Sequence, residues 1–400
     1  MTQDAAVLDA GDPLAGLRDR FVGAQTPLVY FDGNSLGRPL RATVERLPAF
    51  VTDAWGGRLI RGWDETWFDQ PLTLGDELGR IVLGAGPGQV FVGDSTTVML
   101  YKLARAAVDS APERTEIVLD SDNFPTDRYI LEGIAAERGL DLRWIESDPA
   151  GGVTPDQVRE VVGELTALVV LSHVAYRSAY VAEGAEITGI VHDAGALMLW
   201  DLSHSVGSVP LALDEWGADL AVGCTYKYLN GGPGAPAFGY VATRHLARLT
   251  QPIQGWMGHA DPFLMGPGYT PAPSVRRFVS GTPAIVGMLA MQDMLALIDS
   301  VGMEAVRAKS IALTSYAIEL ADDLLAPCGV TVASPREAAS RGGHVTLLHP
   351  RMQEVKDALW AIDVIPDYRD PHGLRVGLSP LSTSFEEVRR GMLAIRDQLV

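Results

Sequence analysis

An acidic residue and a lysine stand 26 residues apart near the middle of this 400-residue chain. Asp201 closes the apolar run at residues 197–200, and Lys227 lies within Thr225-Tyr226-Lys227-Tyr228. A lysine amine forms a Schiff base with an aldehyde, and a carboxylate pairs with a protonated ring nitrogen. A lone lysine after a strand is more often an ordinary surface residue. Together with the motifs that follow, the pair favours a site for pyridoxal 5′-phosphate (PLP), which has both an aldehyde and a ring nitrogen.

Small hydroxyl residues precede a predicted helix at residues 97–109. The segment Asp94-Ser95-Thr96-Thr97 would place free backbone N–H groups and the positive end of the helix dipole together, and this combination binds anions. Ordinary N-capping explains the same residues when they are considered alone. Beside a PLP lysine, we expect a cradle for the cofactor phosphate.

Two segments at predicted strand ends could contact a flat ring. Phe124 could stack on a heterocycle and Asp127 could bond to its polar substituents, although a loop with a helix cap at Thr126 is the alternative. His204, three residues after Asp201, could contact the cofactor or be a hydrogen-bonded loop histidine. Open α/β sheets bind ligands beyond the carboxyl ends of their strands, where all these residues are expected.

Arg375 stands inside an otherwise apolar strand candidate, Gly373-Leu374-Arg375-Val376-Gly377. A buried arginine needs an anionic partner, and its planar fork suits a substrate carboxylate. A structural salt bridge is the alternative.

Two motifs point elsewhere and are set aside. Gly231-Gly232-Pro233-Gly234 lacks the Lys-Ser/Thr ending of a P-loop and the spacing of a dinucleotide fingerprint, so we expect a tight turn close to the lysine. Cys328 could be the nucleophile of a desulfurase, but its apolar and turn-forming neighbours favour a buried structural thiol.

Short apolar runs alternate with amphipathic segments between about residues 90 and 245, which predicts βα units around a mostly parallel sheet. The predicted strands lie at residues 117–120, 142–145, 167–172, 197–201, 219–223 and 237–241. The predicted helices lie at residues 97–109, 126–138, 154–164 and 185–194.

The pattern changes after residue 285. Long helices are predicted at 284–298 and 303–325, then short strands at 330–333, 344–348 and 374–378, and a closing helix at 385–400. We predict that residues 1–50 contribute to a small domain, that residues 51–290 form the large PLP-binding domain, and that residues 291–400 form the small C-terminal domain.

Composition limits the partners. The 32 basic and 50 acidic residues give a net charge of −18, which argues against nucleic acid and anionic membrane surfaces but not against a small anionic substrate. No apolar run approaches the roughly 18 residues of a membrane span, and no signal-peptide pattern is visible. The two cysteines have no metal-site spacing. We expect a cytoplasmic protein.

Together these motifs resemble the kynureninase family, within the aspartate-aminotransferase-like (fold type I, class V) PLP enzymes. The segments Gly33-Asn34-Ser35-Leu36-Gly37 and Thr225-Tyr226-Lys227-Tyr228-Leu229-Asn230 carry the most specific part of the resemblance. It extends nearly end to end, through residues 30–37, 124–127, 200–209, 224–234, 255–259, 276–278, 281–283, 341–345 and 367–369.

The resemblance implies an α/β fold, with a mostly parallel seven-stranded sheet in the large domain and a smaller α+β C-terminal domain. It implies that Lys227 is the Schiff-base lysine and that Arg375 anchors the substrate α-carboxylate, with Asn34 and Ser35 beside it. The implied cofactor contacts are Asp201 and His204 at the pyridine ring, Thr96, Thr97 and Tyr226 at the phosphate, Phe124 and Asp127 at the ring face, Ser172 at a strand end, and Trp256 and Thr282 across the interface of a homodimer with shared active sites.

The implied reaction is hydrolytic Cβ–Cγ cleavage of L-kynurenine or 3-hydroxykynurenine to anthranilate or 3-hydroxyanthranilate plus L-alanine, a step of tryptophan catabolism. In that reaction Lys227 removes the α-proton. Tyr226 is the candidate proton donor to the β-carbon, and His204 is a weaker candidate.

Some residues depart from the family pattern, and several of them would reshape the aryl pocket: Ala175, Ala179, Met257, Ala284 and Ser382. The alternative hypothesis is therefore a paralogue that acts as a lyase, desulfurase or aminotransferase on another amino acid. A catalytically inactive scaffold is a third, which the presence of Lys227, Asp201 and Arg375 argues against.

Overall fold

The centre of the molecule is a seven-stranded sheet in the order β2-β8-β7-β6-β5-β3-β4. A computed structural model describes residues 3–400. Within this sheet β8 runs antiparallel to both of its neighbours, and the other pairs are parallel. The mostly parallel sheet predicted from the sequence is thus confirmed. The strands are β2 (Val90–Gly93), β3 (Glu116–Asp120), β4 (Asp141–Ile145), β5 (Thr166–Ser172), β6 (Leu197–Asp201), β7 (Leu220–Gly223) and β8 (Ala237–Val241).

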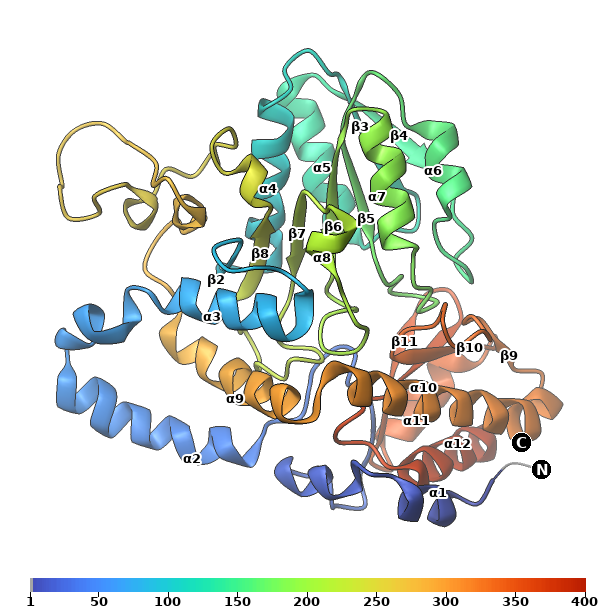
Figure 1. The fold of residues 1–400 in the computed structure, drawn as a ribbon. Helices are drawn as coiled ribbons and strands as arrows, with labels where there is room; N and C mark the ends of the chain where they lie inside the picture. Colours follow the sequence, from blue (N-terminus) through green and yellow to red (C-terminus); the bar gives the residue numbers. More distant parts are fainter. Residues whose placement is uncertain (1–2) are drawn as a thin grey trace.

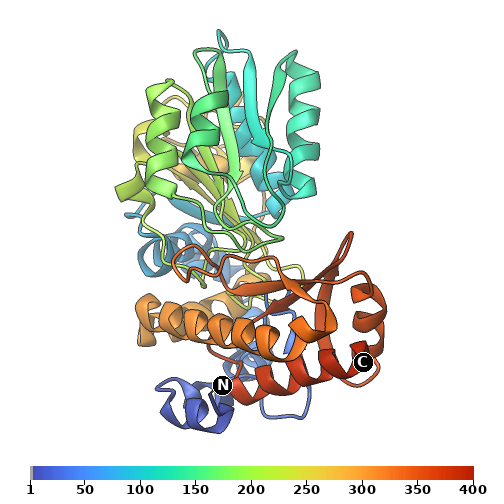
Figure 2. The same ribbon diagram turned by 90° about the vertical axis from the view of Figure 1, so that its right-hand side faces the viewer.

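Helices cover both faces of this sheet (Figures 1 and 2), so its central strands are apolar along their whole length. One face packs against α4 (Thr96–Asp109) and α5 (Pro125–Arg138). The other packs against α3 (Gln70–Leu78), η4 (Gly79–Leu83), α6 (Pro155–Val161), α7 (Gly184–Asp193), α8 (Leu213–Trp216) and α9 (Ile285–Val301).

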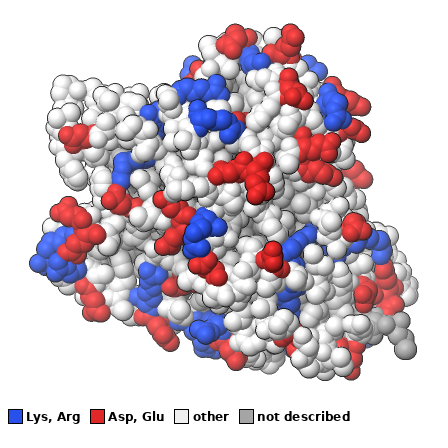
Figure 3. Space-filling view, in the orientation of Figure 1, with Lys and Arg blue, Asp and Glu red and all other residues white. Residues whose placement is uncertain are grey.

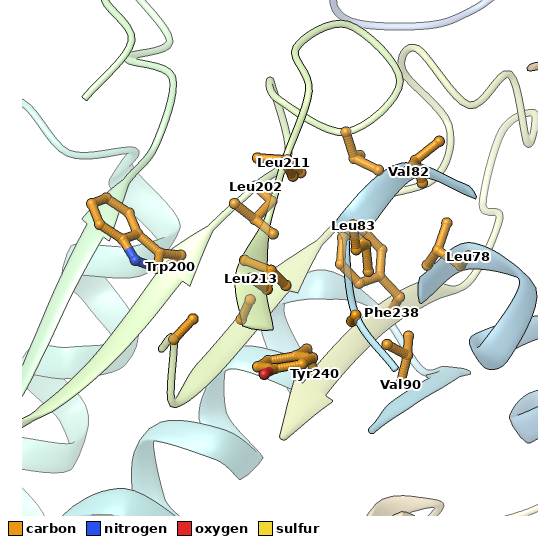
Figure 4. Packing of buried hydrophobic residues seen from close by; sticks show 14 of the residues in the cluster. Leu78, Val82, Leu83, Val90, Trp200, Leu202, Leu211, Leu213, Phe238 and Tyr240 are labelled. Atoms are coloured by element: carbon orange, nitrogen blue, oxygen red, sulfur yellow. The ribbon is translucent and has the colours of Figure 1, made fainter. Parts of the chain in front are cut away.

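Figure 4 shows how α3 and η4 close the β2–β8 edge of the sheet. Leu78 and Leu83 pack beside Val90 of β2 and Phe238 of β8, all with 0% exposure. Burying a side chain of this size contributes roughly 1.5–3 kcal/mol relative to leaving it exposed. This packing fixes the strand that leads directly into the predicted phosphate segment.

A second, five-stranded sheet lies below the first in Figure 2, in the order β1-β11-β12-β10-β9. Helices α10, α11 and α12 cover one face, and the other face contacts the segment 176–177 of the large sheet's loops. The elements are β1 (Val29–Phe31), β9 (Thr331–Val332), β10 (His344–Leu348), β11 (Val364–Arg369), β12 (Gly373–Gly377), α10 (Met303–Leu320), η8 (Ala321–Leu325), η9 (Ala326–Cys328), α11 (Met352–Trp360) and α12 (Phe385–Leu399).

Because β1 pairs in parallel with β11, the amino-terminal segment is part of the second sheet. The division into domains at residues 50 and 290 stays a prediction, and residues 1 and 2 lie outside the described residues. The remaining elements are α1 (Ala5–Gly11), η1 (Ala15–Arg20), α2 (Arg41–Ala49), η2 (Phe50–Gly56), η3 (Trp63–Trp67), η5 (Thr243–His245), η6 (Trp256–Gly258) and η7 (Val275–Phe278).

The sequence patterns missed the elements before residue 90 and several later ones, of which three are instructive. Strand β2 has only four residues and follows a Gly-Pro-Gly segment, which reads as a loop. Strand β11 contains Pro366 and charged residues, a composition that argues against a strand until its partners are known. Helix α11 was not predicted either, although it packs on β11 and β12.

Asp219 holds several elements together at the amino ends of strands β6 and β7. Its carboxylate accepts hydrogen bonds from His192 (2.8 Å), His245 (2.6 Å), Arg244 (2.7 Å) and the Met198 N–H (2.8 Å). Burial by itself would raise the pKa of Asp219, but these hydrogen bonds outweigh it and hold the pKa below its usual range. The network ties α7, β6 and η5 to the start of β7.

Within residues 3–400, no single helix has both the length and the apolar character that a membrane span needs. Helix α9 and the helical segment Met303–Cys328 meet both requirements only when taken together, and they are bent by 92° to each other.

Candidate active site

Loops that follow the parallel strands bring the predicted lysine, histidine and aromatic ring together. Lys227, in the loop after β7, has its Nζ atom 2.9 Å from His204 Nε2 and 5.8 Å from the centre of the Phe124 ring. Lys227 is only 9% exposed. Asp201 ends β6, and Ser172 ends β5 directly beside it. These residues share the carboxyl edge of the sheet, as expected from the sequence.

The amino-terminal motif holds the lysine loop in place. The Gly37 N–H donates to the Tyr226 carbonyl (2.8 Å), and Asn230 Nδ2 donates to the Arg38 carbonyl (2.7 Å). A Cβ atom on Gly37 would lie 2.5 Å from the Lys227 carbonyl oxygen, closer than real Cβ contacts. Only glycine fits there, which gives a physical reason for the motif that ends at Gly37.

Two buried carboxyl groups meet below the lysine. Burial, reinforced by the nearby carboxylates of Asp201 and Asp120, raises the pKa of Asp127 well above its usual range. Asp201 Oδ1 accepts a hydrogen bond from the Ser203 N–H (2.8 Å), while buried Asp127 Oδ2 has no partner among the described residues. A cationic N–H group between the two acids would satisfy both, and the protonated ring nitrogen of PLP is such a group.

A cavity of about 420 Å³ opens at the amino end of α4. Thr96, Thr97 and Tyr226 line it together with residues 93–95 and 278–284, among them Thr282. Thr282 therefore lines the cavity of its own chain, whereas the resemblance placed it across a dimer interface; a contact of Thr282 with a partner's site stays a prediction. Ser95 caps the helix by accepting from the Val98 N–H (3.4 Å), so the capping alternative holds for Ser95. The first-turn N–H groups of a 14-residue helix and the hydroxyl side chains suit a phosphate. The residues therefore fit PLP at both of its charged ends.

Phe124 presents a ring face beside Lys227. Tyr176 packs edge-on against Phe124, with ring centroids 5.6 Å apart. Asn123 holds the preceding turn, because its Oδ1 accepts from the Phe124 N–H (2.8 Å) and from Ser172 Oγ (3.2 Å). Ser172 thus contacts the loop that carries Phe124.

His204 is neutral at physiological pH. Burial first, and then the positive charges of Lys227 and Arg375, lower its pKa well below the usual range. The ring of His344 in β10 lies 5.6 Å away, and the Nδ1 atoms of both histidines are buried without a partner among the described residues. A neutral His204 can exchange a hydrogen bond with the Lys227 amine, but it is a poor acid.

Arg375 is 1% exposed and is hydrogen-bonded on every side. Its Nε donates to Asp367 Oδ2 (2.7 Å), its Nη1 to the Tyr176 carbonyl (2.8 Å) and its Nη2 to Ser35 Oγ (3.1 Å). The structural ion pair that was the alternative reading is therefore present. Asn34, by contrast, is fully buried and neither polar atom of its side chain has a partner among the described residues.

Other predicted residues lie apart from this centre. Trp256 begins η6 and is 37% exposed, and its ring packs near Phe263 at a centroid distance of 6.1 Å. Cys328 is half-buried rather than buried, and its Sγ contacts the Leu324 carbonyl at 3.8 Å. In the part of the chain that the structure describes, no group of three or more His, Cys, Asp or Glu side chains is placed to hold a metal ion.

Sequence reasoning missed the residues that support this site from a distance along the chain. Tyr176, Asp367 and His344 lie in segments whose local pattern carries no functional signal, although residues 341–345 and 367–369 belong to the family resemblance. Lys102 was not predicted either, although a lysine among Leu, Ala and Val at buried helical spacing is a signal that could have identified it.

Comparison with known proteins decides the family. The kynureninase of Burkholderia pseudomallei is 41% identical, over 99% of this chain and 95% of that protein. The kynureninase of Pseudomonas fluorescens is 40% identical, over 96% and 92%. The chain belongs to the kynureninase family. Residues 306–395 also match the family model described as the kynureninase C-terminal domain. The predicted family, the PLP cofactor and the class of enzyme, a PLP-dependent hydrolase, are confirmed.

Solved structures confirm the fold. The apo cysteine desulfurase of Thermococcus onnurineus NA1 superposes with a TM-score of 0.82 at 18% identity, over 96% of this chain and 97% of that chain. A C-DES variant with glycine covalently linked to its PLP cofactor gives a TM-score of 0.82 at 19% identity, over 95% and 99%. This is the PLP fold type I that the kynureninase resemblance implied.

The buried acid pair generates a prediction about stability. Because the pKa of Asp127 is raised in the folded state, folding favours its protonated form, and its ionisation destabilises the fold above the ordinary Asp pKa of about 4. Asp127→Asn should therefore raise the free energy of unfolding of the cofactor-free protein by about 1–2 kcal/mol near neutral pH.

The measurement is urea unfolding of both cofactor-free proteins across pH. The advantage of Asp127→Asn should grow as the pH rises above about 4, where the unfolded wild type ionises first, and then level off. If Asp127→Asn is less stable than the wild type at neutral pH, the conclusion that the ionised Asp127 carboxylate destabilises the fold is wrong.

Proposed function

We propose that this protein hydrolyses the Cβ–Cγ bond of L-kynurenine or 3-hydroxykynurenine, giving anthranilate or 3-hydroxyanthranilate and L-alanine. The proposal rests on one observation in particular: in a chain of the kynureninase family, the Lys227 amine lies 2.9 Å from His204 at the carboxyl edge of the sheet. Arg375, a residue suited to a substrate carboxylate, is linked to the same site, because it donates to the carbonyl of Tyr176, whose ring packs against Phe124.

The residues proposed to hold PLP surround Lys227. Thr96, Thr97, Tyr226 and Thr282 would bind the phosphate, Asp201 and Asp127 the ring nitrogen side, and Phe124 the ring face, with Ser172 and His204 at the ring edge. Lys227 would bond covalently to the aldehyde carbon. When bound, PLP withdraws electrons from the α- and β-carbons of an amino-acid substrate.

Lys227 is the proposed base. Once the substrate amine has replaced Lys227 on the cofactor, the free lysine amine would remove the α-proton of the substrate. It would then deliver that proton to the cofactor carbon that bears the substrate nitrogen. His204 supports this exchange, because its neutral imidazole can accept or donate one hydrogen bond at 2.9 Å without competing for the proton.

Tyr226 is the proposed proton donor to the β-carbon. Burial raises its pKa, so the phenol keeps its proton at neutral pH and can donate it. His204 is disfavoured as the donor, because its pKa is lowered. Water adds to the γ-carbonyl carbon, the Cβ–Cγ bond breaks, the aryl fragment leaves as a carboxylate, and the proton from Tyr226 completes the methyl group of alanine.

The central prediction concerns Lys227. The protein supplied with PLP should convert L-kynurenine to anthranilate, read by anthranilate fluorescence, and Lys227→Ala should lower kcat by at least about 1,000-fold, in line with the contribution of a positioned proton-transfer group. Borohydride reduction of the PLP-loaded protein should leave a pyridoxyl group on the peptide that contains Lys227.

The chain offers a control, since it has only four lysines. Lys356→Ala, at a partly exposed position on α11 beside Trp360, should leave both the activity and the label unchanged. If the wild type converts neither kynurenine nor 3-hydroxykynurenine, the paralogue hypothesis is favoured. If it converts both, the ratio of the two kcat/KM values identifies the preferred substrate.

Arg375 is proposed to anchor the α-carboxylate of the substrate. The carboxylate would take the place of Ser35 Oγ or of the Tyr176 carbonyl as a hydrogen-bond acceptor, while Arg375 keeps its ion pair with Asp367. Arg375→Ala should weaken binding of kynurenine by about 2–5 kcal/mol, the scale for removing one partner of a buried charge pair. The decarboxylated analogue of kynurenine is the control ligand, and its affinity should change far less. Equal losses for both ligands would assign Arg375 to the structural ion pair alone.

We further propose a homodimer with shared active sites. Exposed apolar side chains cluster on the arm after α2 and on the loop after η6, including Trp55, Ile60, Phe263, Leu264 and Met265, which are 53–76% exposed. Figure 3 shows that the protrusion at the upper left, formed by this loop, carries few charged side chains. Such a surface is typical of a protein interface, and a two-fold dimer would bring Trp256 to a second site.

The dimer proposal predicts complementation. Lys227→Ala and Trp256→Ala chains, each impaired alone, should regain activity when they are unfolded and refolded together, because each hybrid dimer then holds one complete site. Size-exclusion chromatography should give twice the chain mass. If Trp256 acts within its own chain, no activity returns on mixing.

We also propose a cytoplasmic location. Both cysteines, buried Cys224 and half-buried Cys328, are free thiols, which suits a reducing compartment.

A further inference from the structure

A fully buried lysine lies behind the wall of the proposed phosphate cavity. Lys102 stands on α4 and has 0% exposure. Its ammonium donates to Asp94 Oδ2 (2.6 Å), to the Phe278 carbonyl and to Ser280 Oγ (3.2 Å). These three acceptors use all three N–H bonds of the group.

The three acceptors belong to two segments that are far apart in the sequence. Asp94 precedes α4, and Phe278 and Ser280 follow η7. All three line the cavity itself, although Lys102 does not. Thr96 lies two residues beyond Asp94 and Thr282 lies two residues beyond Ser280, so Lys102 joins the two walls that carry the phosphate-binding hydroxyls.

The energetic cost of burying the Lys102 ammonium indicates that this residue does more than fill space. Burial lowers the pKa of Lys102, and only the Asp94 carboxylate opposes that effect. Asp94 itself has a left-handed backbone with φ of +47°, which is uncommon for a residue other than glycine. An apolar side chain would fill the same helix position without either cost, but it would leave three acceptors without a donor.

We propose that Lys102 is a positioning residue for cofactor phosphate binding, because it ties the segment that carries Thr96 and Thr97 to the segment that carries Thr282. This inference rests on the proposed phosphate site. The ammonium also offsets the negative charge of Asp94, which lines the cavity and would otherwise repel a dianion.

The test compares PLP with pyridoxal, which has the same aldehyde and ring but no phosphate. Both are titrated into the cofactor-free full-length protein and their binding is followed by absorbance. Lys102→Met should weaken PLP binding by about tenfold or more, the size expected for losing one charged hydrogen bond, while pyridoxal affinity changes little. The selectivity for PLP over pyridoxal should therefore fall.

The chain supplies a matched control in Lys309, a second buried lysine, on α10. It is 6% exposed, it pairs with Asp12, and burial lowers its pKa in the same way. Lys309→Met should lower the unfolding midpoint to a similar degree as Lys102→Met but leave the selectivity for PLP at its wild-type value.

Each outcome has one meaning. If Lys102→Met loses stability and keeps its selectivity, Lys102 is structural only and the proposal is overturned. If Lys102→Met does not fold, Ser280→Ala, which removes one tie at a partly exposed residue, should still lower selectivity, and an unchanged value would overturn the proposal. If the wild type itself binds PLP and pyridoxal equally, the phosphate site is wrong, and the failure then belongs to the proposed function.

Discussion

The parallel pairing of β5, β6 and β7 is the constraint on which the site depends. Pairing in register sets Ser172 beside Asp201, and the next strand delivers the loop of Lys227 to the same edge. Buried backbone N–H and C=O groups are costly to leave unpaired, so the register of these strands fixes the positions of the residues at their ends. The Asp219 network anchors the opposite ends of β6 and β7.

Electrostatic cost is concentrated at the carboxyl edge of that sheet. Asp127, Asp120 and His204 are all held away from their ordinary protonation behaviour by burial, and the pKa of Asp120 rises to about 7. Such groups destabilise a protein unless a ligand completes their interactions. The apolar clusters on both faces of the sheet supply the stability that makes this tolerable.

Much of the centre could be predicted from the sequence, because its signals are local. An acid at a strand end, a lysine in the loop after the next strand and hydroxyl residues before a helix each reflect neighbouring residues. The supporting residues could not be predicted in the same way. Lys102 meets Ser280 across 178 residues and Arg375 meets Ser35 across 340, and no periodicity encodes such contacts. For Arg375 the structural alternative is present as an ion pair with Asp367, and the role of anchoring a substrate carboxylate stays a prediction.

The parallel pairing of β1 with β11 has a consequence for the timing of synthesis. Residues 29–31 leave the ribosome early, but their partner strand begins at residue 364. The Gly37 N–H that braces the lysine loop follows directly from β1. The nascent chain therefore carries an unpaired, apolar amino-terminal strand until about nine-tenths of it has been made, a span in which chaperone protection matters most. A prematurely terminated chain could form the large sheet, yet it would lack the partner strand that seats this brace.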